Sequence, residues 1–172
     1  MWIFGYGSLM WDDWEKQFNG RRVDGTSLKG FHRSFNKKST TSRGTKQFPC
    51  PTLGLEPKAD CECIGTAFEI PDQFAATARA YLEDREGKSL PLTKLEIVLP
   101  DKTTIKAYVP LNNSDSPTYM GRIPIEERTL MAKRASGKRG ACEDYARNIL
   151  KKLNTLGIND EHVKEFVGKI PK

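Results

Sequence analysis

Residues 2–9 read Trp2-Ile3-Phe4-Gly5-Tyr6-Gly7-Ser8-Leu9. The first three residues predict a short apolar strand, which ends at once in two glycines that flank a tyrosine. Glycine lets the backbone turn sharply and come close to another group. Backbone N–H groups at such a turn can point together at an anion or a developing oxyanion. The pattern predicts a strand followed by a tight loop. On spacing alone, a turn around a buried aromatic residue explains this loop better than an anion-binding site does.

The next part of the chain predicts strands and one helix. The polar, glycine-punctuated segment Arg21–Leu55 indicates short strands joined by loops. Ile64–Ile70 alternates apolar and polar residues as a strand does. A helix is expected from Asp72 to Glu86, because apolar residues recur there at helical spacing. Gly87 is the expected end of that helix.

The remaining residues predict a hairpin and then helices. Leu95–Leu99 and Ile105–Val109 are apolar segments joined by a short turn sequence, which is typical of a β-hairpin. Helices are expected between Pro124 and Gly137 and over Ala141–Leu156. A last helix is expected to start at Asn159, which is a favourable N-cap residue.

This order of elements predicts the fold class. Strands, a single helix, more strands and a helical C-terminal third lack the βαβ alternation of a doubly wound parallel sheet. We therefore expect an α+β fold: a small, mainly antiparallel barrel with flanking helices. No linker divides the 172 residues, so residues 1–172 are expected to form a single domain.

Charge and hydropathy exclude several classes of protein. The chain carries 28 basic and 22 acidic residues, for a net charge of +6, and Gly25–Leu55 contains six basic residues and no acidic one. A basic surface attracts anions, whether nucleic acid, an acidic membrane or a small carboxylate. No aromatic-rich RNA-binding motif, membrane-length apolar run or secretory signal is present. We expect a cytoplasmic protein that binds neither nucleic acid nor a membrane.

The chain offers few residues for metal or nucleophilic chemistry. His32 and His162 lack metal-ligand or catalytic spacing. We expect no metal and no cofactor. The four cysteines are Cys50, Cys61, Cys63 and Cys142. We expect free thiols for all of them, because a reducing cytoplasm disfavours disulfides.

The segment Glu83-Asp84-Arg85-Glu86 gathers three carboxylates and one guanidinium at the expected end of a helix. One acid can pair with Arg85 while another faces a cavity and acts as a base. On spacing alone, a solvated run of charges explains the segment better. Glu83 and Glu86 are both candidates for the base, because a helix end is not defined to one residue by sequence.

Taken together, these segments resemble a known family. Trp2–Trp11 closely resembles the opening of the ChaC-type γ-glutamylcyclotransferases, whose pattern is Trp-Ile-Phe-Gly-Tyr-Gly-Ser-Leu-x-Trp. Further matches follow in the family's order over most of the chain. They are Gly30-Phe31-His32-Arg33-Ser34-Phe35, Ser39 with Arg43-Gly44, Tyr81-Leu82 with Arg85-Glu86, Ala107-Tyr108-Val109, Tyr119-Met120-Gly121, Ser136-Gly137 with Glu143-Asp144-Tyr145, and Leu156-Gly157-Ile158-Asn159-Asp160-Glu161-His162.

The resemblance implies a fold and an activity. The family's fold is a small mixed barrel with flanking helices. Its members cleave a γ-glutamyl peptide, typically glutathione, into 5-oxoproline and the released amine, which is Cys-Gly for glutathione. The substrate's own α-amine attacks its γ-carbonyl, so neither a cofactor nor a protein nucleophile is required. A carboxylate that takes up a proton and returns it to the leaving amine suits this reaction.

The resemblance also implies a set of site residues. Glu86 would be the general acid/base. Arg43 lies in the basic segment that can attract a substrate with two carboxylates. The expected substrate-binding residues are Tyr6, Gly7, Ser8, Leu9, Arg43, Tyr108 and Tyr119.

Departures from the family pattern leave alternatives open. The family often has Gly-Gly-Tyr shortly after its catalytic glutamate, whereas this chain reads Gly87-Lys88-Ser89-Leu90-Pro91. The true substrate could therefore be another γ-glutamyl amine or dipeptide. A non-catalytic module that binds a γ-glutamyl group is the second class of function, and a basic nucleic-acid-binding protein is the third.

Overall fold

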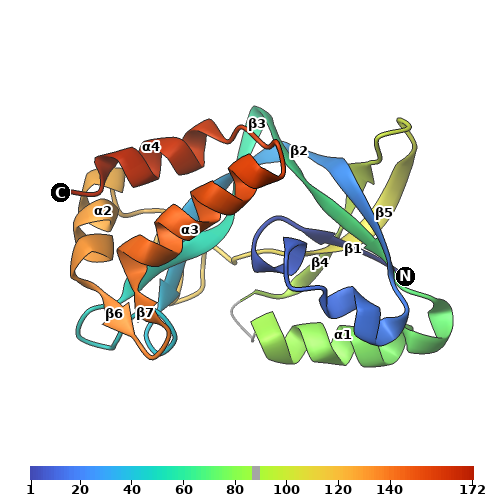
Figure 1. The fold of residues 1–172 in the computed structure, drawn as a ribbon, viewed down its shortest axis with the longest axis horizontal. Helices are drawn as coiled ribbons and strands as arrows, with labels where there is room; N and C mark the ends of the chain where they lie inside the picture. Colours follow the sequence, from blue (N-terminus) through green and yellow to red (C-terminus); the bar gives the residue numbers. More distant parts are fainter. Residues whose placement is uncertain (87–89) are drawn as a thin grey trace. The chain divides into compact units, whose positions relative to one another are not determined.

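A computed structural model describes residues 1–86 and 90–172, and these residues contain a closed barrel of five strands and four α-helices (Figure 1). The strand order around the barrel is β1-β3-β2-β4-β5. The β1–β3, β2–β4 and β4–β5 pairs are antiparallel, whereas β1 and β5 are parallel. The expected mixed, mainly antiparallel barrel with helices is confirmed. The barrel strands are β1 (Trp2–Gly5), β2 (Arg21–Ser39), β3 (Cys50–Glu69), β4 (Leu92–Val98) and β5 (Thr104–Pro110).

The described chain divides into two compact units. Unit 1 comprises residues 1–32 and 57–113, and unit 2 comprises residues 33–56 and 114–172. β2 and β3 contribute residues to both units. None of the helices in the described residues is long and apolar enough to cross a membrane. The remaining elements are α1 (Asp72–Glu86), α2 (Ile125–Arg134), α3 (Cys142–Thr155), α4 (Glu161–Lys169), the 3₁₀ turns η1 (Ser8–Met10) and η2 (Trp14–Phe18), and the short strands β6 (Ser136–Gly137) and β7 (Gly140–Ala141).

The core of unit 1 lies between the sheet and α1. Ile3 on β1 and Phe68 on β3 are register partners, so their side chains share one face of the sheet. Ala78 and Leu82 are four residues apart on α1, and this spacing brings them to one side of the helix. All of these side chains are completely buried in one apolar cluster, which also contains Leu9, Trp14, Phe18 and Ile70.

One expectation for this region is wrong. Arg21–Leu55 was expected to form short strands joined by loops, but β2 runs unbroken from Arg21 to Ser39. Gly25 and Gly30 have positive φ angles of 73° and 78° within β2. Glycine adopts this conformation without a steric penalty, so it can bend a strand without ending it. Gly25 and Gly30 therefore mark bends within β2 rather than strand ends.

Unit 2 is built on three helices that pack against one another, α2, α3 and α4. The rings of Phe35 and Phe166 stack with centroids 4.0 Å apart. Arg33 and Asp160 form a buried ion pair at 2.9 Å. The carboxylate of Asp160 also accepts a hydrogen bond from the Val163 N–H and so caps α4. Asp160 is thus the N-cap, rather than the expected Asn159. Its carboxylate makes the cap and the ion pair with Arg33 at the same time.

The ends of the other helices agree with expectation to within a few residues. α1 begins at Asp72 and includes Glu86. Gly87, expected as its end, lies outside the described residues. α2 ends at Arg134, and the chain then forms the two-stranded β6–β7 ribbon instead of continuing in a helix to Gly137.

The expectation that all four cysteines are free thiols is wrong. Cys50, at the start of β3, and Cys142, at the start of α3, form a disulfide with their Cα atoms 5.7 Å apart. Both residues are completely buried. Cys61 and Cys63 take no part in this disulfide. The disulfide pairs residues 92 positions apart, and no spacing rule in the sequence connects them.

We predict that opening the Cys50–Cys142 disulfide destabilises the protein. A crosslink that closes a loop of this length restricts the unfolded chain, and its loss costs about 2–4 kcal/mol. For a chain of this size, such a loss lowers the midpoint of thermal unfolding by roughly 5–15 °C. Thermal melts with and without dithiothreitol, and of Cys142→Ala, measure the effect. Cys61→Ala is the control and should melt like the wild type; an unchanged melt of the reduced protein would contradict the prediction.

Candidate active site

The loop after β1 is shaped by close packing at Gly5. Gly5 pairs with Thr66 at the end of the β1–β3 ladder. A Cβ atom at Gly5 would lie 2.9 Å from the Phe68 ring and 3.0 Å from the Leu9 Cβ. Glycine has no side chain that could collide with these groups, so the chain can fold back over the sheet directly after β1. This packing confirms the close backbone approach that the glycine pattern predicts.

Tyr6 is an internal anchor of this loop. Its side chain is 5% exposed, and its hydroxyl donates a 2.8 Å hydrogen bond to the Pro110 carbonyl at the end of β5. The hydroxyl therefore ties the loop to the barrel. Any contact of Tyr6 with a substrate would accordingly run through its backbone more readily than through this oxygen.

The other three loop residues differ in exposure. Leu9 is buried in the core of unit 1, Gly7 is partly buried and Ser8 is exposed. Gly7 precedes η1, whose first hydrogen bond joins the Met10 N–H to the Gly7 carbonyl at 2.9 Å. In the part of the chain that the structure describes, the backbone N–H groups of Ser8 and Leu9 are not used by this turn. These backbone N–H groups thus belong to the same turn as the exposed Ser8 hydroxyl.

Arg85 joins this loop to the C-terminal end of α1. Its guanidinium donates to the Ser8 hydroxyl at 3.2 Å and forms an ion pair with Asp12. The Arg85 Nε lies 3.7 Å from the Glu86 carboxylate, whose side chain is 17% exposed. The guanidinium also donates to the Tyr81 hydroxyl at 3.4 Å. Glu86 and Ser8, predicted as site residues from distant parts of the sequence, are therefore brought to one place through a single arginine.

Arg85 carries a firmly held positive charge. Burial disfavours the charged guanidinium, but hydrogen bonds to Asp12 and Tyr81 and the charges of Asp12 and Glu86 outweigh it. The pKa of Arg85 is therefore raised above its ordinary value. Arg85 thus remains a cation beside Glu86 at any ordinary pH.

The two candidate bases occupy different surroundings. Glu83 is 52% exposed and accepts a 2.8 Å hydrogen bond from Arg79, one helical turn earlier. Glu86 is mostly buried and lies at the end of α1 beside Arg85. This arrangement favours Glu86 over Glu83 as the base, because Glu83 faces solvent and is paired on its own helix.

Tyr108 lies on β5, two residues before Pro110, the residue to which Tyr6 is hydrogen-bonded. It pairs with Ile3 across the parallel β1–β5 contact. Its hydroxyl accepts a 3.4 Å hydrogen bond from Arg79, whose guanidinium lies 5.0 Å from the centre of the ring. The Lys94 Nζ lies 5.7 Å from the same ring. Tyr108 thus stands among cations on the flank of α1.

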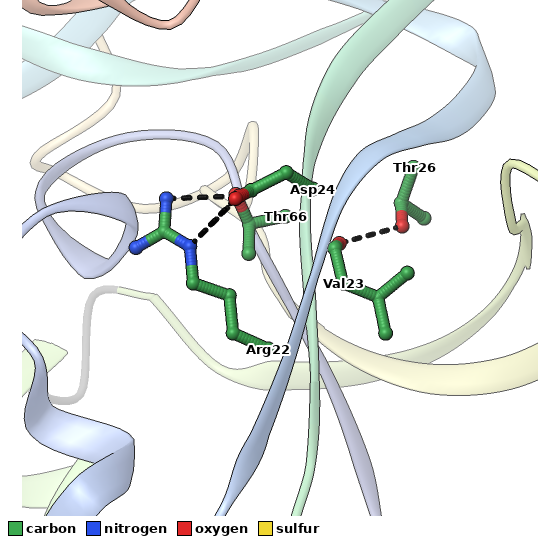
Figure 2. Close-up of polar contacts among 5 residues, drawn as sticks. All are labelled: Arg22, Val23, Asp24, Thr26 and Thr66. Carbon is green, nitrogen blue, oxygen red and sulfur yellow. Dashed lines mark hydrogen bonds and ion pairs between the residues drawn. The ribbon is translucent and has the colours of Figure 1, made fainter.

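A polar network beside the loop has no counterpart among the sequence predictions. Figure 2 shows the Arg22 and Asp24 side chains together beside Thr66. Arg22 donates to both oxygens of Asp24 at 2.8 and 2.9 Å, and the buried Thr66 hydroxyl donates to Asp24 at 2.6 Å. Because Thr66 is the register partner of Gly5, this network lies directly across the ladder from the start of the loop. No sequence motif marks it.

The bend at Gly25 accompanies this network. Thr26 is buried, and its hydroxyl donates to the Val23 carbonyl at 3.0 Å across the bend (Figure 2). Burial raises the pKa of Asp24, but hydrogen bonds from Arg22 and Thr66 and the charge of Arg22 together lower it below its ordinary value. Asp24 is therefore held as a carboxylate.

Arg43 and Tyr119 belong to unit 2. The Arg43 guanidinium lies 5.2 Å from the centre of the Tyr145 ring and donates to the Arg139 carbonyl. Tyr119 donates its hydroxyl to Glu56. Burial, followed by the hydrogen bond to Glu56 and its charge, raises the pKa of Tyr119 to about 12. Tyr119 is thus a neutral phenol at physiological pH.

The described residues contain no group of three or more His, Cys, Asp and Glu side chains placed to hold a metal ion. The chemically distinctive arrangement in unit 1 is instead a carboxylate, a guanidinium and a backbone loop. A carboxylate can transfer protons, and backbone N–H groups can hold an anion or an oxyanion.

Comparisons with known proteins find relatives that match over the length of this chain. The family model described as ChaC-like protein matches residues 1–172. The glutathione-specific gamma-glutamylcyclotransferase of Escherichia coli is 30% identical over 175 residues, covering all of this chain and 73% of the relative. Gamma-glutamylcyclotransferase 2-3 of Arabidopsis thaliana is 29% identical, covering 99% and 88% of the two chains.

A solved structure shares the fold. The crystal structure of a yeast γ-glutamyl cyclotransferase specific to glutathione superposes with a TM-score of 0.87 at 20% identity, covering 99% of this chain and 95% of that one. The family resemblance seen in the sequence is confirmed by the family model, and this chain belongs to the ChaC-like protein family.

Proposed function

We propose that this protein is a γ-glutamylcyclotransferase that acts on a γ-glutamyl peptide, with glutathione as the first candidate. The observation that carries the proposal is the position of Glu86, beside an arginine that also binds Ser8 in the loop after β1. The names of relatives that match over at least 99% of this chain support the same activity. The single-domain organisation and the cytoplasmic location expected from the sequence remain part of the proposal.

The proposed reaction needs one group that moves a proton. The substrate's α-amine attacks its own γ-carbonyl, a C–N bond closes the five-membered ring, and the amide C–N bond to the leaving group breaks. At neutral pH an α-amine is mostly protonated, so a proton must leave before the attack. In this proposal Glu86 accepts that proton and delivers it to the departing amine. The ring nitrogen loses a second proton as it becomes an amide, and this proton takes the same route, so that the released amine leaves as an ammonium. The products are 5-oxoproline and, from glutathione, Cys-Gly.

The loop supplies the other part of the proposal. Backbone N–H groups of Gly7, Ser8 and Leu9 would hold the substrate's α-carboxylate or the developing oxyanion. The Tyr6–Pro110 hydrogen bond and the Arg85–Ser8 contact hold this loop at a defined distance from Glu86. Folding the flexible glutamyl chain into an attacking geometry is itself a source of rate. Tyr108, in the same unit, stays in the proposal as a further substrate contact. The substrate contacts expected for Arg43 and Tyr119, which belong to unit 2, stay predictions from the family resemblance.

We predict that Glu86→Gln greatly slows turnover. Loss of a general acid/base lowers kcat by about 10²–10⁴-fold. The measurement is 5-oxoproline released from glutathione at neutral pH, without added metal or cofactor. Asp84→Asn, an exposed neighbour, is the matched control and should keep full activity.

Two outcomes would contradict this assignment. If Glu86→Gln remains active and Glu83→Gln does not, the base is Glu83. If the wild type is inactive on glutathione, a panel of γ-glutamyl amines and dipeptides follows. Inactivity across that panel would reject the enzymatic proposal in favour of a binding module.

We also predict that Arg85 positions the site. Arg85→Met removes the link between Glu86, Ser8 and Asp12, and a displacement of about 1 Å costs about 10²-fold in rate. kcat should fall by that order with a smaller change in KM. Arg85→Lys should recover only part of it, because lysine keeps the charge but lacks the planar fork.

The control for Arg85 is Arg21→Met. Arg21 is an exposed arginine of unit 1 that pairs with Glu69. It should keep both kcat and the thermal midpoint. If Arg85→Met lowers only the thermal midpoint and keeps kcat, Arg85 is structural and the positioning role is rejected.

A further inference from the structure

A cavity of about 390 Å³ lies along the flank of α1 in unit 1. Its apolar part includes Ala75 and Ala76, and its polar part consists of cations and one tyrosine hydroxyl. A cavity of this size accommodates a small organic ligand. The lining residues are Met1, Trp2, Ala75, Ala76, Arg79, Lys94, Lys106 and Tyr108.

The strand register explains why positive charges gather there. Lys94 on β4 lies directly opposite Tyr108 on β5, and Lys106 precedes Tyr108 by two residues, so all three side chains share one face of the sheet. Arg79 approaches the same tyrosine from α1, with its guanidinium 5.0 Å from the ring centre. Two strands and one helix therefore contribute a cation each to one cavity.

Two of these cations are not neutralised by neighbours. Arg79 pairs with Glu83 at 2.8 Å. Among the described residues, neither Lys94 nor Lys106 has a carboxylate oxygen within 4.0 Å, although Glu96 faces Lys106 in the strand register. The cavity consequently has an excess of positive charge and is suited to an anionic group.

The cavity and Glu86 lie along the same side of α1. Residues 75, 79, 83 and 86 recur at the spacing of three or four that places side chains on one stripe of a helix. The Arg79–Glu83 ion pair follows this stripe. Seven residues separate Arg79 from Glu86, which is about 10 Å along the helix.

We propose that this cavity is the leaving-group subsite and that Lys94 and Lys106, assisted by Arg79, bind the terminal carboxylate of a γ-glutamyl peptide. The proposal rests on the function proposed above. Two extended residues beyond the γ-carbonyl span about 7 Å. With the reach of a lysine side chain, that length connects Glu86 to the cations of the cavity. The substrate class that follows is a γ-glutamyl peptide with a free C-terminal carboxylate rather than an uncharged γ-glutamyl amine.

The test compares two substrates that differ in one charge: glutathione and its glycine C-terminal amide. The wild type should turn over glutathione with a kcat/KM about tenfold higher, because pairing with cations favours the acid. In the double variant Lys94→Met/Lys106→Met, the KM for glutathione should rise about tenfold at nearly constant kcat, while the amide is unaffected. The preference should also weaken as salt is raised, since the charges are exposed.

The matched control is Lys29→Met/Lys58→Met. These lysines are exposed residues of unit 1 outside the cavity, and their loss changes the net charge by the same amount. The control should keep the preference for the acid. Equal kcat/KM for the acid and the amide in the wild type would overturn the proposal, as would an equal loss of preference in the control.

A binding measurement separates this proposal from the proposed function. Calorimetric titration of Glu86→Gln with glutathione and with its amide measures the binding affinity of each ligand without turnover. In Glu86→Gln, glutathione should bind more tightly than its amide. The difference should disappear in the triple variant Glu86→Gln/Lys94→Met/Lys106→Met. That result supports the subsite even if the wild type forms no 5-oxoproline. Equal binding of the two ligands overturns the subsite alone, whereas binding of neither overturns glutathione as the substrate and the subsite with it.

Discussion

Tight packing where β1 ends controls the geometry of the whole candidate site. At Gly5 a side chain would collide with Phe68 and Leu9, so only glycine lets the chain reverse over the sheet. The Tyr6 hydroxyl then fixes the reversed chain to the Pro110 carbonyl at the end of β5. Because this hydrogen bond is buried, its loss would leave a buried carbonyl without that partner. Loop and barrel therefore form one rigid support for the backbone of residues 7–9.

Arg85 extends this support to the helix. The guanidinium contacts Ser8, Asp12 and Glu86 at once, and these contacts keep it charged in spite of its burial. A carboxylate that must both accept and donate a proton works best when its position does not change between the two steps. The same helix carries Arg79 toward the basic cavity, so one element places the proposed base and one of the proposed cations of the leaving-group subsite.

Sequence reasoning was successful where the signal is local. The β1 strand, the β4–β5 hairpin, α1 and the mixed barrel were all predicted, because alternation, helical periodicity and turn residues reflect nearby backbone geometry. It failed for β2, where Gly25 and Gly30 bend a continuous strand, and for the cysteines, where Cys50 and Cys142 are bonded. The Arg22–Asp24–Thr66 network was also missed, since its residues belong to no motif.

The residues of the candidate site and their chemical types can thus be predicted from the sequence: a glycine-flanked tyrosine after a strand, and a glutamate at a helix end. Their arrangement in space cannot be predicted in this way. Arg85 reaches Ser8 over 77 positions, Tyr6 reaches Pro110 over 104, and the disulfide joins residues 92 apart. Such pairs form only when strand register and helix packing bring distant segments together, and local propensity contains no information about either. The tertiary fold therefore separated Glu86 from Glu83 and gathered Lys94, Lys106 and Arg79 around Tyr108.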